Sequence, residues 1–131
     1  AGPRRRITSG SPWEELAGYS RAVVQGDWAF VSGTVGVDRR TNTLPDGAEA
    51  QAHCALDIIA AALAEVPLSL EDTVRVHAYV PDPADVPAVS AVLKARLGAA
   101  RPANTTVCCP LAVPQARVEI EITALRQTAT P

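Results

Sequence analysis

Residues 117–124, with the sequence Arg-Val-Glu-Ile-Glu-Ile-Thr-Ala, alternate apolar and polar side chains without a break. Successive side chains of a β-strand point to opposite faces of the sheet. One face of this strand would therefore carry Val118, Ile120, Ile122 and Ala124, and the other Glu119, Glu121 and Thr123. Such alternation is typical of an antiparallel or mixed sheet with helices on one face only. The segment predicts a sheet with one buried and one open face.

Three other parts of the chain are predicted to supply strands to this sheet. Residues 23–32 contain two apolar runs on either side of a turn at Gly26, which predicts a β-hairpin. Residues 73–80 also alternate, and we expect them to direct one row of side chains to the core, namely Val74, Val76, Ala78 and Val80. A further strand is expected from Asn104 to Cys109.

The segment that follows Asp46 has a helical period. Apolar side chains recur at the spacing of one helix face, at Ala52, Leu56, Ile59, Leu63 and Val66. Asp46 and Glu49 have the spacing of an N-cap residue and the third residue of a helix, close to a capping box. Pro67 is expected to end the helix, because proline cannot continue the backbone hydrogen bonds.

A second helix is predicted between Asp82 and Gly98. Asp82 is a suitable N-cap residue and Pro83 a suitable residue for the first turn. Asp85 is positioned to form the reciprocal capping hydrogen bond. Its buried stripe would consist of Val86, Val89, Leu93 and Leu97. Gly98 is expected to stop the helix.

The order of these elements, ββ-α-β-α-ββ, predicts an α+β fold. In this fold a mixed or antiparallel β-sheet has two helices packed on one face. The chain has 131 residues, which is the size of one domain. We therefore expect residues 1–131 to form a single domain, with residues 1–10 as a flexible or edge N-terminal segment.

The composition argues against nucleic acid or a membrane as a partner. The net charge is −2 and the pI about 5.6, and the one basic run, Arg4-Arg5-Arg6, has no interleaved aromatic residue. No apolar run approaches the roughly 20 residues that span a bilayer. The N-terminus is polar and basic, unlike a signal peptide. We expect a cytoplasmic protein.

The cysteines and histidines indicate neither a disulfide framework nor a metal site. Cys54, Cys108 and Cys109 are odd in number and lack the spacing of zinc ligands. His53 falls on a predicted helix and His77 on a predicted strand, with no further ligand at a suitable spacing. We expect no metal and no cofactor.

Several short motifs nevertheless match a known pattern in order and spacing. They are Ser32-Gly33 after the hairpin, Gln51 on the first helix, residues 73–82, Arg101-Pro102-Ala103, and Val118 to Glu121 in the last strand. Together they resemble the RidA (YjgF-like) family, also called the endoribonuclease L-PSP family or described as translation initiation inhibitors. The resemblance extends from about residue 19 to residue 124.

The resemblance implies a RidA/chorismate mutase-like fold and a homotrimer with small-molecule clefts at the subunit interfaces. It also implies hydrolysis of enamines or imines to a carbonyl compound and ammonia. In this family pattern, Tyr19 would shape the cleft, Gly33 would bind the substrate through its backbone, and Ser32 and Glu119 would order or deprotonate the attacking water. The local sequence alone leaves other interpretations open: Gly33 as a strand-end glycine, and Glu119 as a solvated residue.

The chain departs from the family at one important position. The family's arginine after the Pro-Ala pair is Asn104 here, and a following cysteine is Thr106. Arginine binds a carboxylate through two parallel charge-assisted hydrogen bonds, whereas asparagine offers one neutral amide. Both positions stay candidate substrate-binding residues, but we expect a substrate other than the usual 2-imino acids.

Arg21 is a candidate for the missing cation. It lies two residues after Tyr19, so on a strand both side chains would share a face. The alternative is a salt bridge at the surface or between subunits. An Arg21 that points into solvent, far from Gly33 and Glu119, would reject the hypothesis.

Three functions are therefore considered. The first is an enamine or imine deaminase, and the second is a trimer that binds a small carbonyl or carboxylate metabolite without turnover, or a specialised-pathway enzyme of the same fold. Asn104 favours binding, because a binding site tolerates loss of an anchor better than a catalyst does. The third, a ribonuclease, is disfavoured by the acidic pI.

Overall fold

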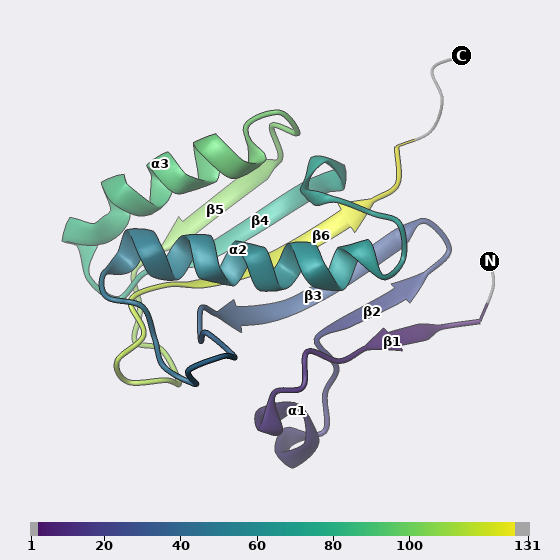
Figure 1. Ribbon diagram of the computed structural model, residues 1–131. Helices are drawn as coiled ribbons and strands as arrows, with labels where there is room; N and C mark the ends of the chain where they lie inside the picture. The colour runs from purple at the N-terminus through teal and green to yellow at the C-terminus, as the bar shows by residue number, and fades with distance from the viewer. Residues whose placement is uncertain (1–2, 128–131) are drawn as a thin grey trace.

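Six strands form one mixed sheet in the computed structural model, which describes residues 3–127. They are β1 (Arg5–Ile7), β2 (Ala22–Gln25), β3 (Trp28–Val35), β4 (Thr73–Tyr79), β5 (Ala103–Val107) and β6 (Glu119–Leu125). Their order across the sheet is β1-β2-β3-β6-β4-β5, and only β4 and β5 pair in parallel (Figure 1). The strand with the strictest alternation, β6, thus lies near the middle of the sheet.

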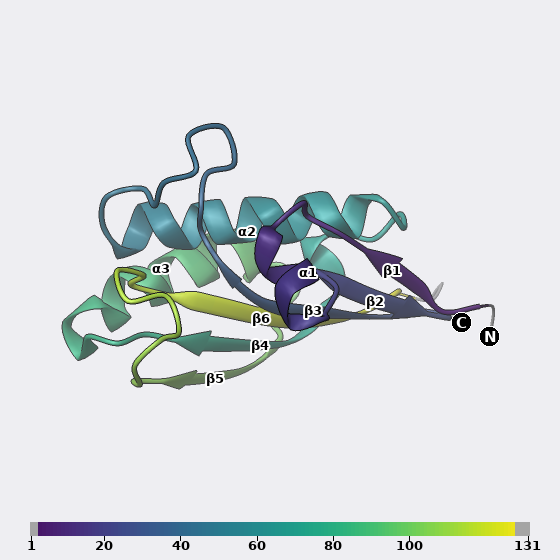
Figure 2. The same ribbon diagram turned by 90° about the horizontal axis from the view of Figure 1, so that it is seen from below.

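Two long helices cover one face of this sheet. They are α2 (Ala48–Ala64) and α3 (Val86–Leu97), and Figure 2 shows both on the same side of the strands. A short helix, α1 (Pro12–Ala17), stands apart from them beside β2 and β3 (Figure 1). Two 3-10 turns complete the elements, η1 (Leu70–Asp72) before β4 and η2 (Pro83–Asp85) before α3. The predicted α+β class, with two helices on one sheet face, is confirmed.

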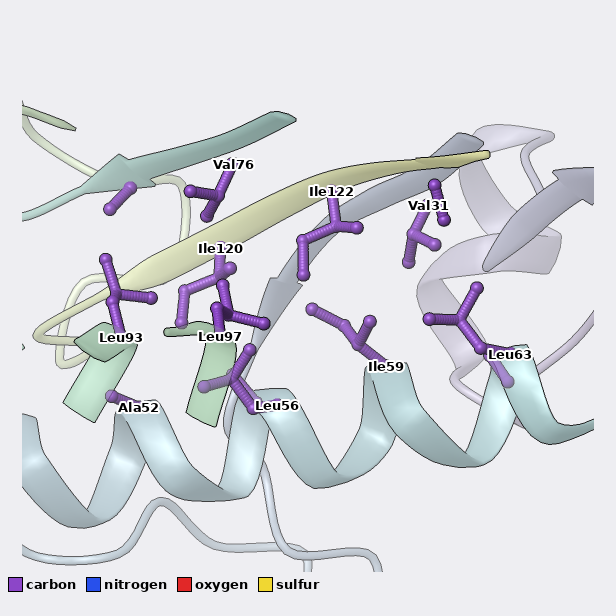
Figure 3. Packing of buried hydrophobic residues seen from close by; sticks show 14 of the residues in the cluster. Val31, Ala52, Leu56, Ile59, Leu63, Val76, Leu93, Leu97, Ile120 and Ile122 are labelled. Atoms are coloured by element: carbon purple, nitrogen blue, oxygen red, sulfur yellow. The ribbon is translucent and has the colours of Figure 1, made fainter. Parts of the chain in front are cut away.

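The core lies between α2, α3 and the inner face of the sheet. Figure 3 shows the side chains of α2 and α3 interleaved with those of the sheet, among them Leu56, Ile59, Leu63, Leu93, Leu97, Val31, Val76, Ile120 and Ile122. The predicted apolar stripes of both helices and the apolar face of residues 118–124 are buried, except that Val86 is only partly so. Burial of these branched side chains stabilises the sheet–helix contact by about 1.5–3 kcal/mol for each residue.

The start of α2 differs from the prediction. The helix begins at Ala48, and its N-cap is Gly47 at φ 90°, with no side chain capping it. A positive φ at this position favours glycine. The prediction of a capping box formed by Asp46 and Glu49 is therefore wrong. At the other predicted cap, Asp82 does accept a hydrogen bond from Ala84 N at 2.9 Å.

Two side chains, one before α3 and one in β4, also differ from the prediction. The carboxylate of Asp85 does not form the predicted capping hydrogen bond. It accepts a hydrogen bond from Arg117 Nε at 2.8 Å instead. Val74 was expected in the core, yet it is 38% exposed while Thr73 is 3% exposed. The register of β4 against β6 shifts between Thr73 and Arg75, which turns Val74 outward. The strands β5 and β6 each span fewer residues than predicted.

The N-terminal part holds a short strand within residues 1–10, for which a flexible or an edge segment was expected, and a short helix that was not predicted. Residues Arg5–Ile7 form β1, an edge strand that pairs antiparallel with β2. The helix α1 follows it, with Ser11 as the N-cap and Gly18 at φ 73° as the C-cap. Among residues 3–127, no helix has the length and apolarity needed to cross a membrane.

Candidate functional site

A bulge in β3 creates the site. Val31 and Thr34 are both buried and pair with Ile122 and Ile120 of β6, so the register shifts between them. The extra residue bends β3 at Ser32 and Gly33. A Cβ atom at Gly33 would collide with the carboxylate of Glu119. Glycine is therefore needed here for the close approach of backbone and carboxylate.

Glu119 is the first residue of β6 and belongs to the open face of the sheet. Burial raises the pKa of its carboxyl above the ordinary 4.5, the charge of Arg21 opposes this, and the charge of Glu121 adds to it. Within residues 3–127, its carboxylate has no hydrogen-bond or ion-pair partner. A half-buried carboxyl with a raised pKa binds a proton more readily than an ordinary carboxyl, which suits it to accept a proton and return it.

Arg21 lies beneath the bulge rather than in solvent. Its side chain is buried, and Nη1 donates to Gly33 O at 2.9 Å and to Thr34 Oγ1 at 3.0 Å. Its Nε donates to Glu14 at 3.3 Å, and its guanidinium carbon lies 5.6 Å from the centre of the Tyr19 ring. Arg21 therefore holds the backbone of Gly33 in place. Its side chain does not point into solvent far from Gly33 and Glu119, which was the arrangement that would have rejected its role in the cleft.

Glu14 of α1 is the buried partner of Arg21, and the sequence analysis missed it. Its carboxylate also accepts from Thr8 Oγ1 at 2.7 Å and from Ser9 N at 3.2 Å. Burial raises its pKa, but the hydrogen bonds from Ser9 and Thr8 and the charge of Arg21 outweigh burial, so that the pKa lies below 4.5. This network ties α1 to the base of the β3 bulge.

We expect Glu14→Ala to lower the free energy of unfolding by about 3–5 kcal/mol, because it leaves the Arg21 charge buried and unpaired. The contribution of Glu14 is present above the pKa of an unfolded glutamate and is lost as pH falls through the lowered pKa of the folded state. Urea unfolding at pH 7 and at pH 3 measures both effects. An equal loss at the two pH values would contradict this account.

These side chains surround one small cavity of about 140 Å³. Of the predicted site residues, Tyr19, Arg21, Gly33 and Glu119 line it. Other segments complete the wall: Trp13 of α1, Val37 and Arg39 of the loop after β3, Ile58 of α2, and Ala112 and Val113 of the loop before β6. The arrangement places a carboxyl, a guanidinium and glycine backbone around a space with apolar sides.

The other predicted site residues lie outside this cavity. Ser32 donates its hydroxyl hydrogen to Ser20 O at 2.6 Å, so the hydroxyl is engaged with the backbone. Asn104 and Thr106 lie on β5, at the far edge of the sheet, where Thr106 Oγ1 donates to Asn104 Oδ1 at 3.0 Å. Asn104 lines a separate hollow of about 300 Å³ against α3. A single chain therefore does not bring Asn104 to Glu119.

A polar cluster lies beside Glu119 on the open face. Tyr79 donates its hydroxyl hydrogen to Glu121 at 2.7 Å, and His77 Nδ1 lies 3.1 Å from the same oxygen. The carboxylate of Glu121 raises the pKa of Tyr79 to about 12. Glu121 lies on the predicted polar face of β6, and its contacts with His77 and Tyr79 link β6 to β4.

No cluster of three or more His, Cys, Asp or Glu side chains that could hold a metal ion occurs in the part of the chain that the structure describes. The three cysteines are free thiols. Burial raises the pKa of Cys54, which disfavours the reactive thiolate. The ionisable groups of the cavity itself are those of Tyr19, Arg21, Arg39 and Glu119.

Comparisons with known proteins agree with this architecture. The family model described as "Endoribonuclease L-PSP" matches residues 10–126. The 2-iminobutanoate/2-iminopropanoate deaminase of Dermatophagoides farinae is 30% identical over 91% of this chain and 94% of its own. The crystal structure of Rv2704 from Mycobacterium tuberculosis, a member of the YjgF/YER057c/UK114 family, is 35% identical, with a TM-score of 0.86 over 95% of this chain and 100% of its own.

A further structure, that of RidA from the Antarctic bacterium Psychrobacter sp. PAMC 21119, is 30% identical. Its TM-score is 0.77, over 82% of this chain and 88% of that one. The family model covers all the residues that line the cavity except Ser9. On these grounds the chain belongs to the endoribonuclease L-PSP family, the RidA or YjgF/UK114 family of the sequence resemblance.

Proposed function

We propose that this protein hydrolyses a small enamine or imine to a carbonyl compound and ammonia in the cavity of Tyr19, Arg21, Gly33 and Glu119. The observation that carries the proposal is the carboxyl of Glu119, which has a raised pKa, lies against the backbone of Gly33 and has no partner within residues 3–127. The relative from Dermatophagoides farinae, whose name is that of an imine deaminase, supports the same class of reaction.

The chemistry needs one group that moves a proton twice. Ionised Glu119 accepts a proton from water as the water oxygen bonds to the imine carbon, and it gives that proton to the nitrogen, so that the C=N double bond becomes a C–N single bond. In a second round, Glu119 accepts the proton of the new hydroxyl group and gives it to the same nitrogen. The C–N bond then breaks, ammonia leaves, and the oxygen that has lost its proton becomes the carbonyl oxygen. One water is consumed, and no metal or cofactor takes part.

We further propose a cytoplasmic homotrimer, as the resemblance implies. The open face of the sheet carries exposed apolar side chains, including Phe30 at 53% exposure and Val107 at 41%. Exposed apolar side chains on one face of a sheet favour contact with a partner surface. A solution mass of one chain, 13.7 kDa, by sedimentation equilibrium would reject the trimer.

The proposal is tested by a coupled assay. An amino-acid oxidase generates 2-imino acids, and their disappearance is followed with the wild type, with Asn104→Arg and without protein. The sequence alone led us to expect a substrate other than the usual 2-imino acids, but Tyr19, Arg21, Gly33 and Glu119 line a cavity that Asn104 does not enter. We therefore expect the wild type to accelerate the decay of 2-imino acids above the spontaneous rate. No acceleration by the wild type would overturn the proposal.

The same assay addresses the alternative of a trimer that binds a metabolite without turnover. Asn104, which supplies no positive charge and lies away from the cavity, favours that alternative. Acceleration by Asn104→Arg but not by the wild type would show an intact scaffold whose natural ligand is not a simple 2-imino acid. The binding role, or a specialised-pathway reaction, would then replace the deaminase.

A further inference from the structure

Gln51 of α2 is one of the short motifs noted in the sequence, and the proposed chemistry gives it no role. Its side chain is 3% exposed, although it ends in a polar amide. The other buried residues of α2 are all alanine, leucine or isoleucine. Burial of an amide costs free energy unless its hydrogen-bonding groups find partners, so the contacts of Gln51 explain its place on this helix face.

Both ends of the Gln51 amide bind the backbone of other segments. Nε2 donates to Pro45 O at 3.0 Å, and Oε1 accepts from Arg117 N at 2.8 Å. Pro45 belongs to the loop between β3 and α2, and Arg117 to the loop between β5 and β6 (Figure 1). A carbonyl only accepts and an N–H only donates, so an amide fits both contacts, whereas an ionised carboxylate fits only one of them.

The two loops that Gln51 joins also form walls of the cavity. Arg117 lies two residues before Glu119, so the contact holds the chain just before β6 begins. The residues of the two loops that line the cavity are Val37, Arg39, Ala112 and Val113. One buried side chain therefore ties together segments on two sides of the cavity.

Other contacts do not replace this connection. The pairing of β6 begins at Glu119 itself, opposite Val35 and Tyr79, so the residues before it lack the support of the sheet. The side chain of Arg117 pairs with Asp85, but this ion pair is partly exposed and is expected to contribute little. The backbone contact with Gln51 is the buried one.

We infer that Gln51 is a positioning residue of the cavity: its amide holds the two wall loops together and thereby fixes the carboxylate of Glu119 against Gly33. Gln51 does not line the cavity itself, so it acts through Arg117 and Pro45. This inference rests on the proposed function, since it concerns the reaction of the same cavity.

The first test removes both hydrogen bonds with Gln51→Leu, which keeps much of the bulk of the side chain. We expect kcat for imine hydrolysis to fall by about 10–100-fold, because a displacement of about 1 Å costs on the order of 10²-fold in rate. The matched control is Thr73→Val, which removes another buried hydrogen bond, that of Thr73 Oγ1 to Leu70 O at 2.7 Å. Thr73 lies away from the cavity, so its variant should melt at a lower temperature with kcat unchanged.

Gln51→Glu gives a readout that a merely structural role would not move. The introduced carboxyl can donate to Pro45 O only while it is protonated, and burial raises its pKa. The ratio of the variant kcat to the wild-type kcat should therefore be near one at pH 5 and fall by about tenfold at pH 8. Circular dichroism at both pH values checks that the variant is folded. A ratio that is the same at both pH values would contradict the inference.

The pKa of Glu119 supplies a readout that needs no activity. In Gln51→Leu the carboxyl should reach solvent more easily, so its pKa should fall toward the ordinary 4.5, whereas Thr73→Val should keep the wild-type value. Titration followed by ¹³C NMR of the carboxyl carbon measures both.

The outcomes distinguish the two proposals. If the wild type hydrolyses imines while Gln51→Leu keeps both the kcat and the Glu119 pKa of the wild type, the role of Gln51 is overturned and the proposed function stands. If the wild type hydrolyses no imine, the proposed function is overturned, and the NMR titration alone decides the role of Gln51. A lowered pKa of Glu119 in Gln51→Leu supports that role, and an unchanged pKa overturns it.

Discussion

Replacing Glu119 by glutamine is expected to lower kcat for imine hydrolysis by about 10²–10⁴-fold. Glutamine keeps the size of the side chain but cannot accept a proton from water or return one to nitrogen. The fold should persist, and the melting temperature should not fall, because burial disfavours the ionised carboxyl that the substitution removes. Stopped-flow imine decay and thermal unfolding measure the two effects.

The matched control for this variant is Glu121→Gln, which alters a carboxylate two residues along the same strand face. Glu121 contacts Tyr79 and His77 rather than the cavity, so kcat at neutral pH should change little. Its charge contributes to the raised pKa of Glu119, so removing it should move the acid limb of the pH profile to lower pH. An equal loss of kcat in both variants would contradict the assignment of proton transfer to Glu119.

The pH profile of the wild type follows from the same carboxyl. Glu119 must be ionised to accept the proton, so activity should fall as pH decreases through its pKa. Since burial raises that pKa, the fall should begin at a higher pH than for an ordinary carboxyl of 4.5.

Gly33→Ala is expected to reduce kcat by about 100-fold while the protein stays folded. The added methyl group would meet the end of the Glu119 side chain, which is flexible and can move away. The backbone would then need little adjustment, but the carboxylate would lose its position, and a displacement of about 1 Å costs on the order of 10²-fold in rate. Circular dichroism and imine decay rates measure the fold and the loss.

Gly36→Ala provides the contrast. A methyl group there would collide with the backbone carbonyl of Gln51 on α2, which cannot move without shifting the helix. We expect this variant to unfold at a clearly lower temperature than Gly33→Ala. If Gly33→Ala were as active as the wild type, the close approach of Gly33 and Glu119 would have no role in the reaction.

Much of the fold could be predicted because two periods dominate the sequence. The period of two in residues 118–124 describes a central strand whose inner face is fully buried, and the helical period of residues 52–63 describes one helix on that face. Val74 escaped prediction because the bulge that turns it outward depends on pairing with β6. The N-cap of α2 was misplaced because a backbone conformation at Gly47, rather than a side chain, starts that helix.

The short helix α1 could have been found from the sequence. Ser11 caps its start, Pro12 occupies the first helical position, and Gly18 adopts a positive φ at its end. Each is a standard helix signal. Without α1 the sequence analysis also missed Glu14, and with it the reason why Arg21 is buried.

The candidate site was predicted in part. Tyr19, Arg21, Gly33 and Glu119 come together, and the resemblance to a family had pointed to three of them. Arg39 was missed because no periodicity or motif marks it: it reaches the cavity only through the path of the loop after β3. Asn104 lies at the opposite edge of the sheet in one chain, so its relation to the cavity depends on how chains assemble.

The most direct test of the central claim is a crystal structure of the protein soaked with 2-oxobutanoate. We predict ligand density in the cavity, with the carbonyl carbon facing Gly33 and Glu119. Density in the hollow between α3 and β5 beside Asn104, with the cavity empty, would contradict the account.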